Sequence, residues 1–226
     1  MAEIGLFEAM YSARALRRFK PDPVPDEIIT KVIDAAIRAP SGSNAQSWLF
    51  VVVKDAEKRR QLGAIYHKGS QVITKLYAER PRASHFSEEQ YRRFMSSVVH
   101  LFENMHEAPV LLLACLKSAP AGAAASTLSP EVQSAMTKIA RTQGASIYPA
   151  VQNVILACRA FGLGTVLTTI HTFFEEEVKA IVGLPPEVST FALLPIGYPR
   201  DKFGPVRRLP VNEVACLDNY GKPWPG

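Results

Sequence analysis

Three short runs of apolar residues, at positions 48–53, 110–116 and 191–197, most constrain how this chain can fold. Each run has the length of a β-strand, and its consecutive apolar side chains indicate burial on both faces. Segments with the residue spacing of helices separate the three runs. Strands that alternate with helices in this way predict an α+β or α/β fold, in which helices cover a buried sheet.

Apolar residues recur at helical spacing in the segments between these runs. The expected helices cover residues 4–17, 26–38, 55–66, 147–161 and 175–182. The charged segment 78–107 is also expected to be helical and partly exposed, and residues 165–170 are typical of a short strand. Gly162 follows the helix at 147–161 and is expected to supply the left-handed cap that ends it.

The composition fits a single domain over residues 1–226, because 47% of the chain is hydrophobic and can bury a sizeable core. The formal net charge of +5 suits an anionic ligand such as a phosphate or a nucleotide, although moderate basicity also serves solubility alone. The basic residues form no long run and no nucleic-acid-binding motif. We therefore expect no nucleic-acid partner.

The cysteines and the apolar segments indicate a cytoplasmic location. Cys115, Cys158 and Cys216 are far apart in sequence, which argues against a disulfide framework and against a metal site. The first residues lack the basic and apolar regions of a signal peptide, and no apolar stretch is long enough to span a membrane. A reducing cytoplasm, without a membrane partner, is the default expectation.

The connection between the second helix and the first strand, residues 39–48, is rich in small polar residues. Pro40 cannot continue a helix, and Gly42 can adopt backbone angles closed to other residues. The polar side chains of this loop bond readily to nearby backbone, and they include Ser41, Asn44 and Gln46. A flat polar ligand could lie against such a segment. The same composition is typical of ordinary loops, so the segment alone leaves both interpretations open.

Two groups of arginines could bind an anion. Arg14, Arg17 and Arg18 fall at helical spacing, so one face of the expected first helix gathers three guanidinium groups. Arg207 and Arg208 lie near the C-terminus. Each group alone is also typical of a solvated surface, but together with the polar loop they could hold a phosphorylated, flat cofactor. The sequence has no Walker A loop, no Gly-x-Gly-x-x-Gly, no His-Glu-x-x-His and no Gly-x-Ser-x-Gly motif.

Two further segments are expected to lack regular structure. From residue 198 onward the chain is rich in proline, which predicts an extended arm that needs another surface to order it. Residues 119–130 are rich in Ala, Gly, Ser and Pro, which predicts a lid or a disordered surface loop. The charged segment 78–107 is the other candidate for a lid.

A series of motifs, taken in order along the chain, resembles the FMN-dependent nitroreductase family. The motifs are Arg14-Ala-Leu-Arg-Arg-Phe19, the loop 39–48, Gln152-Asn153, Gly162-Leu-Gly-Thr165, Pro195-Ile-Gly-Tyr-Pro199 and Arg208-Leu-Pro210. The resemblance implies an α+β three-layer sandwich, with a central, mostly antiparallel sheet flanked by helices. It also implies an intertwined homodimer with FMN at the subunit interface, in which the arm of residues 198–226 reaches the partner subunit.

The resemblance also implies which residues line the cofactor. It assigns the FMN phosphate to Arg14 and Arg208, and the N1–C2=O edge of the flavin to Arg17. The loop comes from the partner subunit, and the backbone of residues 169–172 approaches flavin N5. The full set is Arg14, Ala15, Arg17, Pro40, Ser41, Gly42, Asn44, Gln46, Thr169, Ile170, His171, Thr172 and Arg208. No side chain is required as a nucleophile or a base, and His171 is placed on the substrate side.

The implied activity is electron transfer from NADH or NADPH, through FMN, to a small organic acceptor such as a nitroaromatic or a quinone, in a ping-pong cycle. The alternatives within the family are an ene-reductase, a reductive dehalogenase and a flavin-fragmenting enzyme. A flavin-binding module without turnover is the alternative outside catalysis. The chain departs from the family pattern where Ala15 replaces a common serine and where His171-Thr172 replaces a common Glu-Gly pair near N5.

Overall fold

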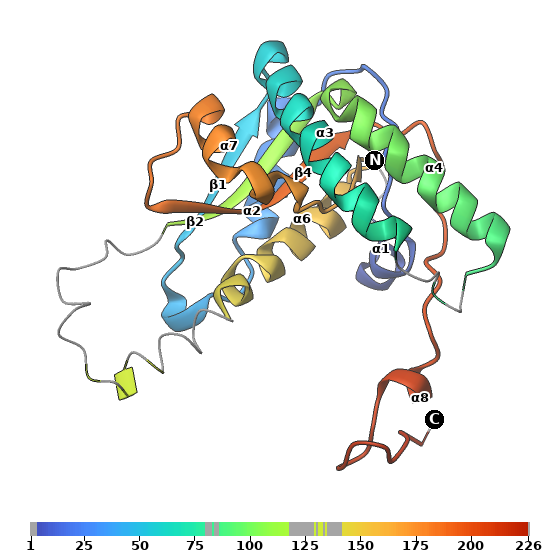
Figure 1. The fold of residues 1–226 in the computed structure, drawn as a ribbon. Helices are drawn as coiled ribbons and strands as arrows, with labels where there is room; N and C mark the ends of the chain where they lie inside the picture. The colour runs from blue at the N-terminus through green and yellow to red at the C-terminus, as the bar shows by residue number, and fades with distance from the viewer. Residues whose placement is uncertain are drawn as a thin grey trace.

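The fold is built around an antiparallel sheet (Figure 1). The computed structural model describes residues 4–79, 83, 86–117, 129, 131–132, 134 and 142–225. Within these residues the sheet has four strands, which are β1 (Trp48–Val53), β2 (Val110–Lys117), β3 (Gly164–Thr165) and β4 (Val188–Gly197). Their spatial order is β1-β2-β4-β3, and every neighbouring pair is antiparallel. The predicted α+β fold with a mostly antiparallel sheet is confirmed.

Helices cover both faces of this sheet (Figure 1). The α-helices are α1 (Leu6–Ser12), α2 (Asp26–Ala36), α3 (Ala56–Ala78), α4 (Glu88–Asn104), α6 (Tyr148–Ala160), α7 (Glu175–Val182) and α8 (Val211–Val214). Short 3-10 helices are η1 (Gly42–Asn44), η2 (Met105–Glu107), η4 (Gln143–Ser146) and η5 (Ile170–Phe174). Side chains of α2 and α6 pack on one face of the sheet, and side chains of α3, α4 and α7 pack on the other.

The alternation of side chains along β2 divides the core into these two layers. Leu112 and Ala114 pack with α2 and α6, whereas Leu111 and Leu113 pack with α3, α4 and α7. All four side chains are fully buried. Burying one leucine side chain is worth about 1.5–3 kcal/mol, so β2 anchors both helical layers and fixes the three-layer arrangement.

The expectation of burial on both faces largely holds for β2 and β4 but is wrong for β1. β1 lies at the edge of the sheet, where β2 is its one hydrogen-bonded neighbour among the described strands. Val53 is the only buried residue of this strand, and residues 48–52 are half-buried. An edge strand receives cover from fewer neighbours, which the apolar run in the sequence does not reveal.

The first helix is shorter than the sequence predicts, because it ends at Ser12 instead of residue 17. The chain then runs along the sheet edge, where the Leu16 amide donates to the Thr165 carbonyl over 3.2 Å. Phe19 forms a bridge with Pro199, and both Leu16 and Phe19 are almost fully buried. Their burial outweighs local helical propensity, so the predicted helix face with three arginines does not form.

The other helix predictions agree with the structure in type and differ in length. α7 has the predicted bounds, and Gly183 after it has a left-handed φ of 71°. Gly162 after α6 is also left-handed, at 72°, so the predicted cap is confirmed. α3 continues to Ala78 instead of ending at residue 66.

The charged segment 78–107 is helical as predicted, since its described residues include the end of α3, then α4 and η2. The strand expected at 165–170 is shorter than predicted. Of these residues, Thr165 ends β3, Thr168 forms a bridge with Leu193, and Ile170 begins η5. The loop predicted at 119–130 lies outside the described residues, except for Ser129.

From Tyr198 onward the chain forms the predicted extended arm, which leaves the body of the fold (Figure 1). The root of the arm is tied to the N-terminal segment. The Arg200 amide donates to the Arg18 carbonyl, and the Val206 amide donates to the Tyr11 carbonyl, each over 2.9 Å. Beyond the root, α8 is a single exposed turn, and most residues that follow are exposed as well.

Candidate functional site

The three arginines predicted on one helix face lie instead on the extended segment after α1. Arg14 is exposed, Arg17 is half-buried, and Arg18 pairs with Asp201 over 3.8 Å. Side chains on an extended segment point in different directions, so the arginines cannot act as one cluster. The structure therefore separates a surface cation, Arg14, from an interior one, Arg17.

The guanidinium of Arg17 lies between α3 and α4. Its Nη1 donates to the Ser97 hydroxyl over 3.4 Å, and its central carbon lies 5.6 Å from the centre of the Phe94 ring. Burial lowers the pKa of Arg17, and the neighbouring Tyr66 and Tyr77 oppose this shift. No Asp or Glu among the described residues forms an ion pair with Arg17. A desolvated cation without a counter-charge is costly, so this position favours an anionic ligand.

Tyr66 connects Arg17 to the segment before η5. Its side chain on α3 is buried, which raises its pKa, while the Arg17 charge and a hydrogen bond with the Thr168 side chain oppose the shift. The amide and the hydroxyl of Thr168 both donate to the Leu193 carbonyl, over 3.2 and 2.6 Å. The structure thus places Arg17 close to the start of residues 169–172. Sequence reasoning missed Tyr66, whose only signal is an aromatic residue on an expected helix.

The 3-10 helix η5 exposes threonines and buries a histidine. Thr169 and Thr172 are exposed, and the Thr172 amide and hydroxyl donate to the Thr169 carbonyl over 3.1 and 2.7 Å. His171 is fully buried, and neither ring nitrogen has a hydrogen-bond partner among the described residues. Burial lowers the pKa of His171 to about 4, so the imidazole is neutral at pH 7. The imidazole lies inside the fold, which does not agree with its predicted place on the substrate side.

The polar loop holds three residues in the left-handed backbone region. Ser43, Asn44 and Gln46 have φ angles of 53°, 52° and 50°. Gly42, the residue with the freedom to adopt such angles, has a φ outside this region. A non-glycine residue in this conformation costs about 1–2 kcal/mol. Backbone strain of this kind concentrates at functional sites, which favours a ligand-binding loop over an ordinary connection.

Hydrogen bonds hold the loop in this strained shape. The Gly42 amide donates to the Ser146 hydroxyl over 3.0 Å, and the Gln46 amide donates to the Ser41 hydroxyl over 3.1 Å. The Gln46 side chain also donates to the Asn44 side chain over 3.3 Å. The loop nevertheless stays accessible, since Ser41 is half-buried and the other predicted residues are exposed, namely Pro40, Gly42, Asn44 and Gln46.

Within one chain, the polar loop and Arg14 lie at opposite ends of α6. The loop bonds to Ser146, shortly before this helix, and Arg159 in its last turn bonds to Ser12. The helix has 13 residues, and at 1.5 Å per residue its length is about 20 Å. A single chain therefore keeps the two parts of the predicted site apart.

The remaining predicted residues lie near the arm. Arg14 and Ala15 are exposed, and Arg14 Nη1 lies 3.6 Å from the point that a Cβ at Gly204 would occupy. Arg208 is also exposed, and its Nη1 donates to the Arg207 carbonyl over 2.8 Å. Neither Arg14 nor Arg208 forms an ion pair with a described Asp or Glu. Both guanidinium groups can therefore accept an anion.

In the described part of the chain, no group of three or more His, Cys, Asp or Glu side chains could hold a metal ion. In the same residues, no helix combines the length and the apolar character needed to cross a membrane. Cys115, Cys158 and Cys216 are free thiols, and Cys216 is the exposed one.

Comparison with known proteins identifies the family. The sequence model of the nitroreductase family matches residues 11–198, which is most of the chain. This chain belongs to the nitroreductase family. It is 30% identical to an NADH dehydrogenase of Thermus thermophilus, over 92% of this chain and 93% of that protein. It is also 31% identical to an iodotyrosine deiodinase of Thermotoga neapolitana, over 95% of this chain and 97% of that protein.

A solved structure supports the same assignment. The crystal structure of oxidized iodotyrosine deiodinase bound to FMN and 3-iodo-L-tyrosine matches this chain with a TM-score of 0.66 and 28% identity. The match covers 95% of this chain and 99% of that one. The family predicted from the ordered motifs is therefore confirmed, and this nitroreductase is a flavin oxidoreductase.

Proposed function

We propose that this nitroreductase binds FMN and transfers electrons from NADH or NADPH to a small organic acceptor, such as a nitroaromatic or a quinone. The observation that carries the proposal is Arg17, a half-buried guanidinium without an ionic partner among the described residues. Such a group suits the N1–C2=O edge of a flavin, which carries negative charge in the reduced form. The FMN in the related deiodinase structure supports the same cofactor.

The other arginines suit the phosphate end of FMN. Arg14 and Arg208 are exposed and lack described carboxylate partners, and the forked guanidinium group matches the geometry of a phosphate. The backbone of residues 169–172, of which Thr169 and Thr172 are exposed, would face flavin N5. Ala15 offers no hydroxyl, so charge and backbone contacts carry the binding at this position.

FMN supplies the redox chemistry of this family, which is acceptance of a hydride from a nicotinamide and delivery of two electrons to an acceptor. The residues of the chain bind and orient the reactants. Arg17 stabilises negative charge at the N1–C2=O edge, and η5 fixes the backbone that faces N5. His171 stays neutral inside the fold, and the flavin chemistry requires no side chain as a nucleophile or general base.

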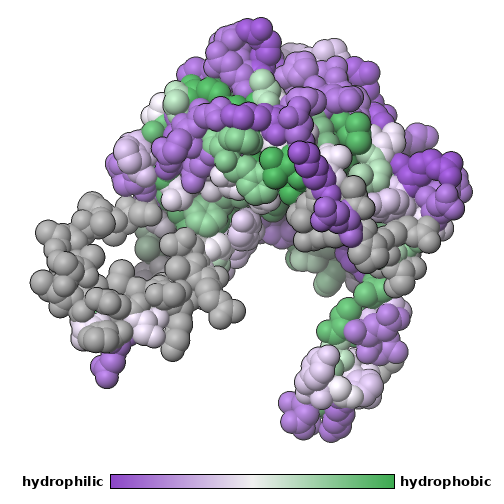
Figure 2. Space-filling view, in the orientation of Figure 1, coloured by the Kyte–Doolittle hydropathy of each residue, from purple (hydrophilic) through white to green (hydrophobic). Residues whose placement is uncertain are grey.

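The enzyme forms a homodimer with one FMN site at each end of the interface. The polar loop and Arg14 lie at opposite ends of α6, so the loop of a second copy completes the site of the first. The arm also needs another surface, because Leu209, Val211 and Val214 are 45%, 64% and 66% exposed (Figure 2). Exposed apolar side chains on an arm that leaves the body of the fold favour docking, here against the second copy.

The start of α4 covers the substrate side of the flavin and acts as the lid. Phe86, Tyr91 and Phe94 form an aromatic cluster with ring centroids 5.7–6.4 Å apart. Phe94 also contacts the Arg17 guanidinium, so the cluster adjoins the proposed flavin edge. Aromatic faces in this position suit a planar acceptor.

Reductive dehalogenation is the second candidate function. Two relatives named iodotyrosine deiodinase, one of them the solved structure, match nearly the whole chain at 31% and 28% identity. A halogenated phenol is also a planar aromatic acceptor, so the aromatic cluster of Phe86, Tyr91 and Phe94 fits it equally well. For either activity we place the enzyme in the cytoplasm, where a free thiol such as Cys216 stays reduced.

The test is an anaerobic titration of the purified protein with NADH and, separately, with NADPH. We expect yellow protein or uptake of added FMN, followed by bleaching of the flavin absorbance by at least one nicotinamide. Reoxidation by a nitroaromatic, a quinone or a halogenated tyrosine then separates the two functions. Protein that stays colourless with added FMN contradicts the proposal, and bound FMN that neither nicotinamide reduces indicates a binding module without turnover.

A further inference from the structure

Arg159, in the last turn of α6, joins α1 to the root of the arm. Its Nε donates to the Ser12 hydroxyl over 2.8 Å, and its Nη2 lies 3.4 Å from a Glu8 carboxylate oxygen. Its central carbon lies 4.3 Å from the centre of the Phe203 ring. Only 15% of the Arg159 side chain is exposed, so these contacts hold it in one place.

The residues that contact Arg159 are close in sequence to two other arginines. Arg14 follows Ser12 by two residues, and its Nη1 lies against Gly204, the residue after Phe203. On the arm, the Val206 amide donates to the Tyr11 carbonyl over 2.9 Å. This bond holds the arm against the N-terminal segment at Val206, which is two residues before Arg208.

Their own side-chain contacts hold Arg14 and Arg208 only loosely, since the bond from Arg208 to the adjacent Arg207 carbonyl is the only hydrogen bond of either guanidinium among the described residues. Both are exposed, and both lie on segments without regular structure. Two free guanidinium groups repel each other and lose side-chain and backbone entropy when they close on one phosphate. A rigid link between their two segments removes part of this cost before the ligand arrives.

We infer that Arg159 is a positioning residue for the phosphate end of the FMN site. It holds the α1 end and the arm root together, so that Arg14 and Arg208 converge on one phosphate. This inference rests on the proposed function. The Nε and Nη2 groups of Arg159 are engaged by Ser12 and Glu8, and Phe203 covers its guanidinium, so Arg159 acts through the other two arginines.

FMN and riboflavin differ only in the phosphate, so the inference predicts that loss of Arg159 weakens FMN binding more than riboflavin binding. The experiment titrates full-length apoprotein with each flavin and follows quenching of flavin fluorescence. In Arg159→Ala we expect FMN affinity to fall about tenfold, which is about 1.4 kcal/mol, and riboflavin affinity to change less than about twofold. Phe203→Ala is expected to shift the ratio in the same direction, because it frees the arm side of the link.

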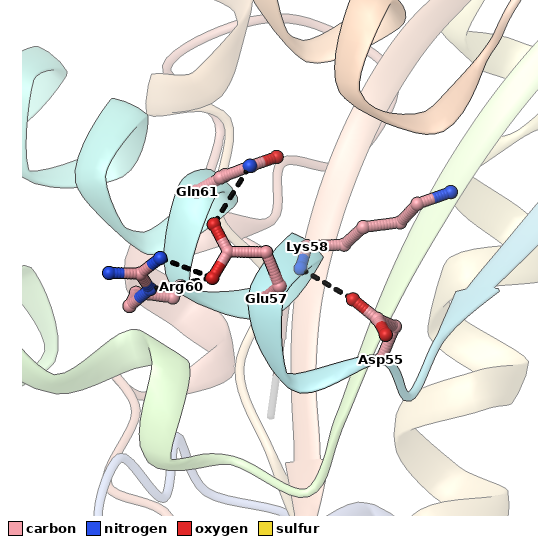
Figure 3. A network of polar contacts seen from close by, with 5 residues as sticks. All are labelled: Asp55, Glu57, Lys58, Arg60 and Gln61. Carbon is pink, nitrogen blue, oxygen red and sulfur yellow. Dashed lines mark hydrogen bonds and ion pairs between the residues drawn. The ribbon is translucent and has the colours of Figure 1, made fainter.

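Arg60→Ala is the matched control for loss of an arginine. Arg60 lies on α3, where its side chain bonds to the Glu57 carboxylate and both groups are largely exposed (Figure 3). Its removal deletes a surface ion pair, which is worth little, and the FMN to riboflavin affinity ratio should stay at the wild-type value. Arg159→Lys keeps the charge but loses the forked N–H donors and the planar guanidinium over the Phe203 ring. We therefore expect a ratio of FMN to riboflavin affinity between those of the wild type and Arg159→Ala.

The outcomes are distinct. Equal loss of FMN and riboflavin affinity in Arg159→Ala overturns the inference, since it indicates general destabilisation. An unchanged FMN affinity, or full retention of the ratio in Arg159→Lys, also overturns it. If the alanine variant does not fold, the lysine and Phe203 variants decide. Wild-type protein that binds neither flavin contradicts the proposed function instead, so the two failures are told apart.

Discussion

Gly69 of α3 lies directly against the backbone of Ile170 in η5. A Cβ at position 69 would fall 2.5 Å from Ile170 Cγ2 and 3.1 Å from the Ile170 carbonyl oxygen. Real Cβ atoms do not approach other atoms to 2.5 Å, so any side chain here must displace η5 or α3. The absence of a side chain at Gly69 therefore sets the position of the segment that we place at flavin N5.

Gly69→Ala is expected to slow flavin reduction without unfolding the protein. Alanine favours a helix interior by about 1 kcal/mol over glycine, which offsets part of an overpacking cost of about 1–3 kcal/mol at the buried position 69. The displaced Ile170 backbone should lower the rate of reduction by NAD(P)H several-fold and shift the flavin potential. Stopped-flow absorbance and a redox titration measure the two effects.

Gly63→Ala provides the control on the same helix. Its Cβ would meet the Cβ of His106 at 3.1 Å, on a neighbour other than η5. The helix gains the same propensity, but the segment at N5 is not touched. Equal effects of the two variants on flavin reduction would show that Gly69 does not position η5.

Arg17→Gln should affect the protein in opposite ways with and without FMN. The guanidinium is desolvated without a described carboxylate partner, so its removal relieves a cost in the apoprotein and should raise the apoprotein Tm. In the holoprotein, reduced flavin loses a stabilising charge, and its midpoint potential should fall. Thermal melts and a redox titration test this pair of effects.

Arg38→Gln is the control for this prediction. Arg38 pairs with Asp34 at the exposed end of α2, so its loss should change neither Tm nor potential appreciably. A fall in apoprotein Tm for Arg17→Gln would mean that Ser97 and Phe94 already compensate the charge. In that case Arg17 would no longer point to an anionic ligand.

The bounds of two elements and the burial of Arg17 show what the sequence could and could not predict. The bounds of α7 and β1 follow from local signals, since each segment has apolar residues at the right spacing and Gly183 marks the end of α7. The burial of Arg17 could not be foreseen, because α1 ends early only where Leu16 meets the sheet edge at Thr165. This contact joins residues that are far apart in sequence.

The polar loop gives the same lesson. Its composition predicted a flexible connection with Gly42 as the unusual residue. The strain falls instead on Ser43, Asn44 and Gln46, in a loop held by the distant Ser146. Local composition locates such a loop, but tertiary hydrogen bonds decide which residues carry its strain.

His171 should make the protein less stable as the pH falls below 6.5. Its pKa is lowered to about 4 in the fold by burial, so between these values the unfolded chain binds a proton that the folded chain excludes. The contribution of neutral His171 to the free energy of unfolding is thus present above pH 6.5 and is lost as the pH drops. The loss is about 2 kcal/mol at pH 5 and about 3 kcal/mol at pH 4. Urea unfolding at pH 7 and pH 5 measures the difference.

Replacing the imidazole should flatten this pH dependence. His171→Met has no titrating group, so its unfolding free energy should change less between pH 7 and pH 5 than that of the wild type. His67→Gln is the control, because His67 is exposed on α3. The same slope in wild type and His171→Met would assign the acid sensitivity to other groups.

A mixing experiment tests whether the polar loop serves the second copy. Arg17→Gln removes the flavin-edge charge, and Asn44→Glu places a carboxylate in the loop, so each variant alone should retain FMN poorly. If one chain supplies Arg17 and the other supplies the loop, a mixed dimer contains one intact site. Random pairing of two variants makes half of the dimers mixed, and about a quarter of all sites should bind FMN again.

The measurement is FMN retained after the two variants are unfolded together and refolded, compared with each variant refolded alone. Native mass spectrometry of the mixture confirms that mixed dimers form. Asn44→Gly serves as a second loop variant, because glycine accepts the φ of 52° and removes only the side chain. Mixed dimers without recovered FMN would mean that Arg17 and Asn44 of the same chain share a site, and a monomer at all concentrations would rule out the proposed interface.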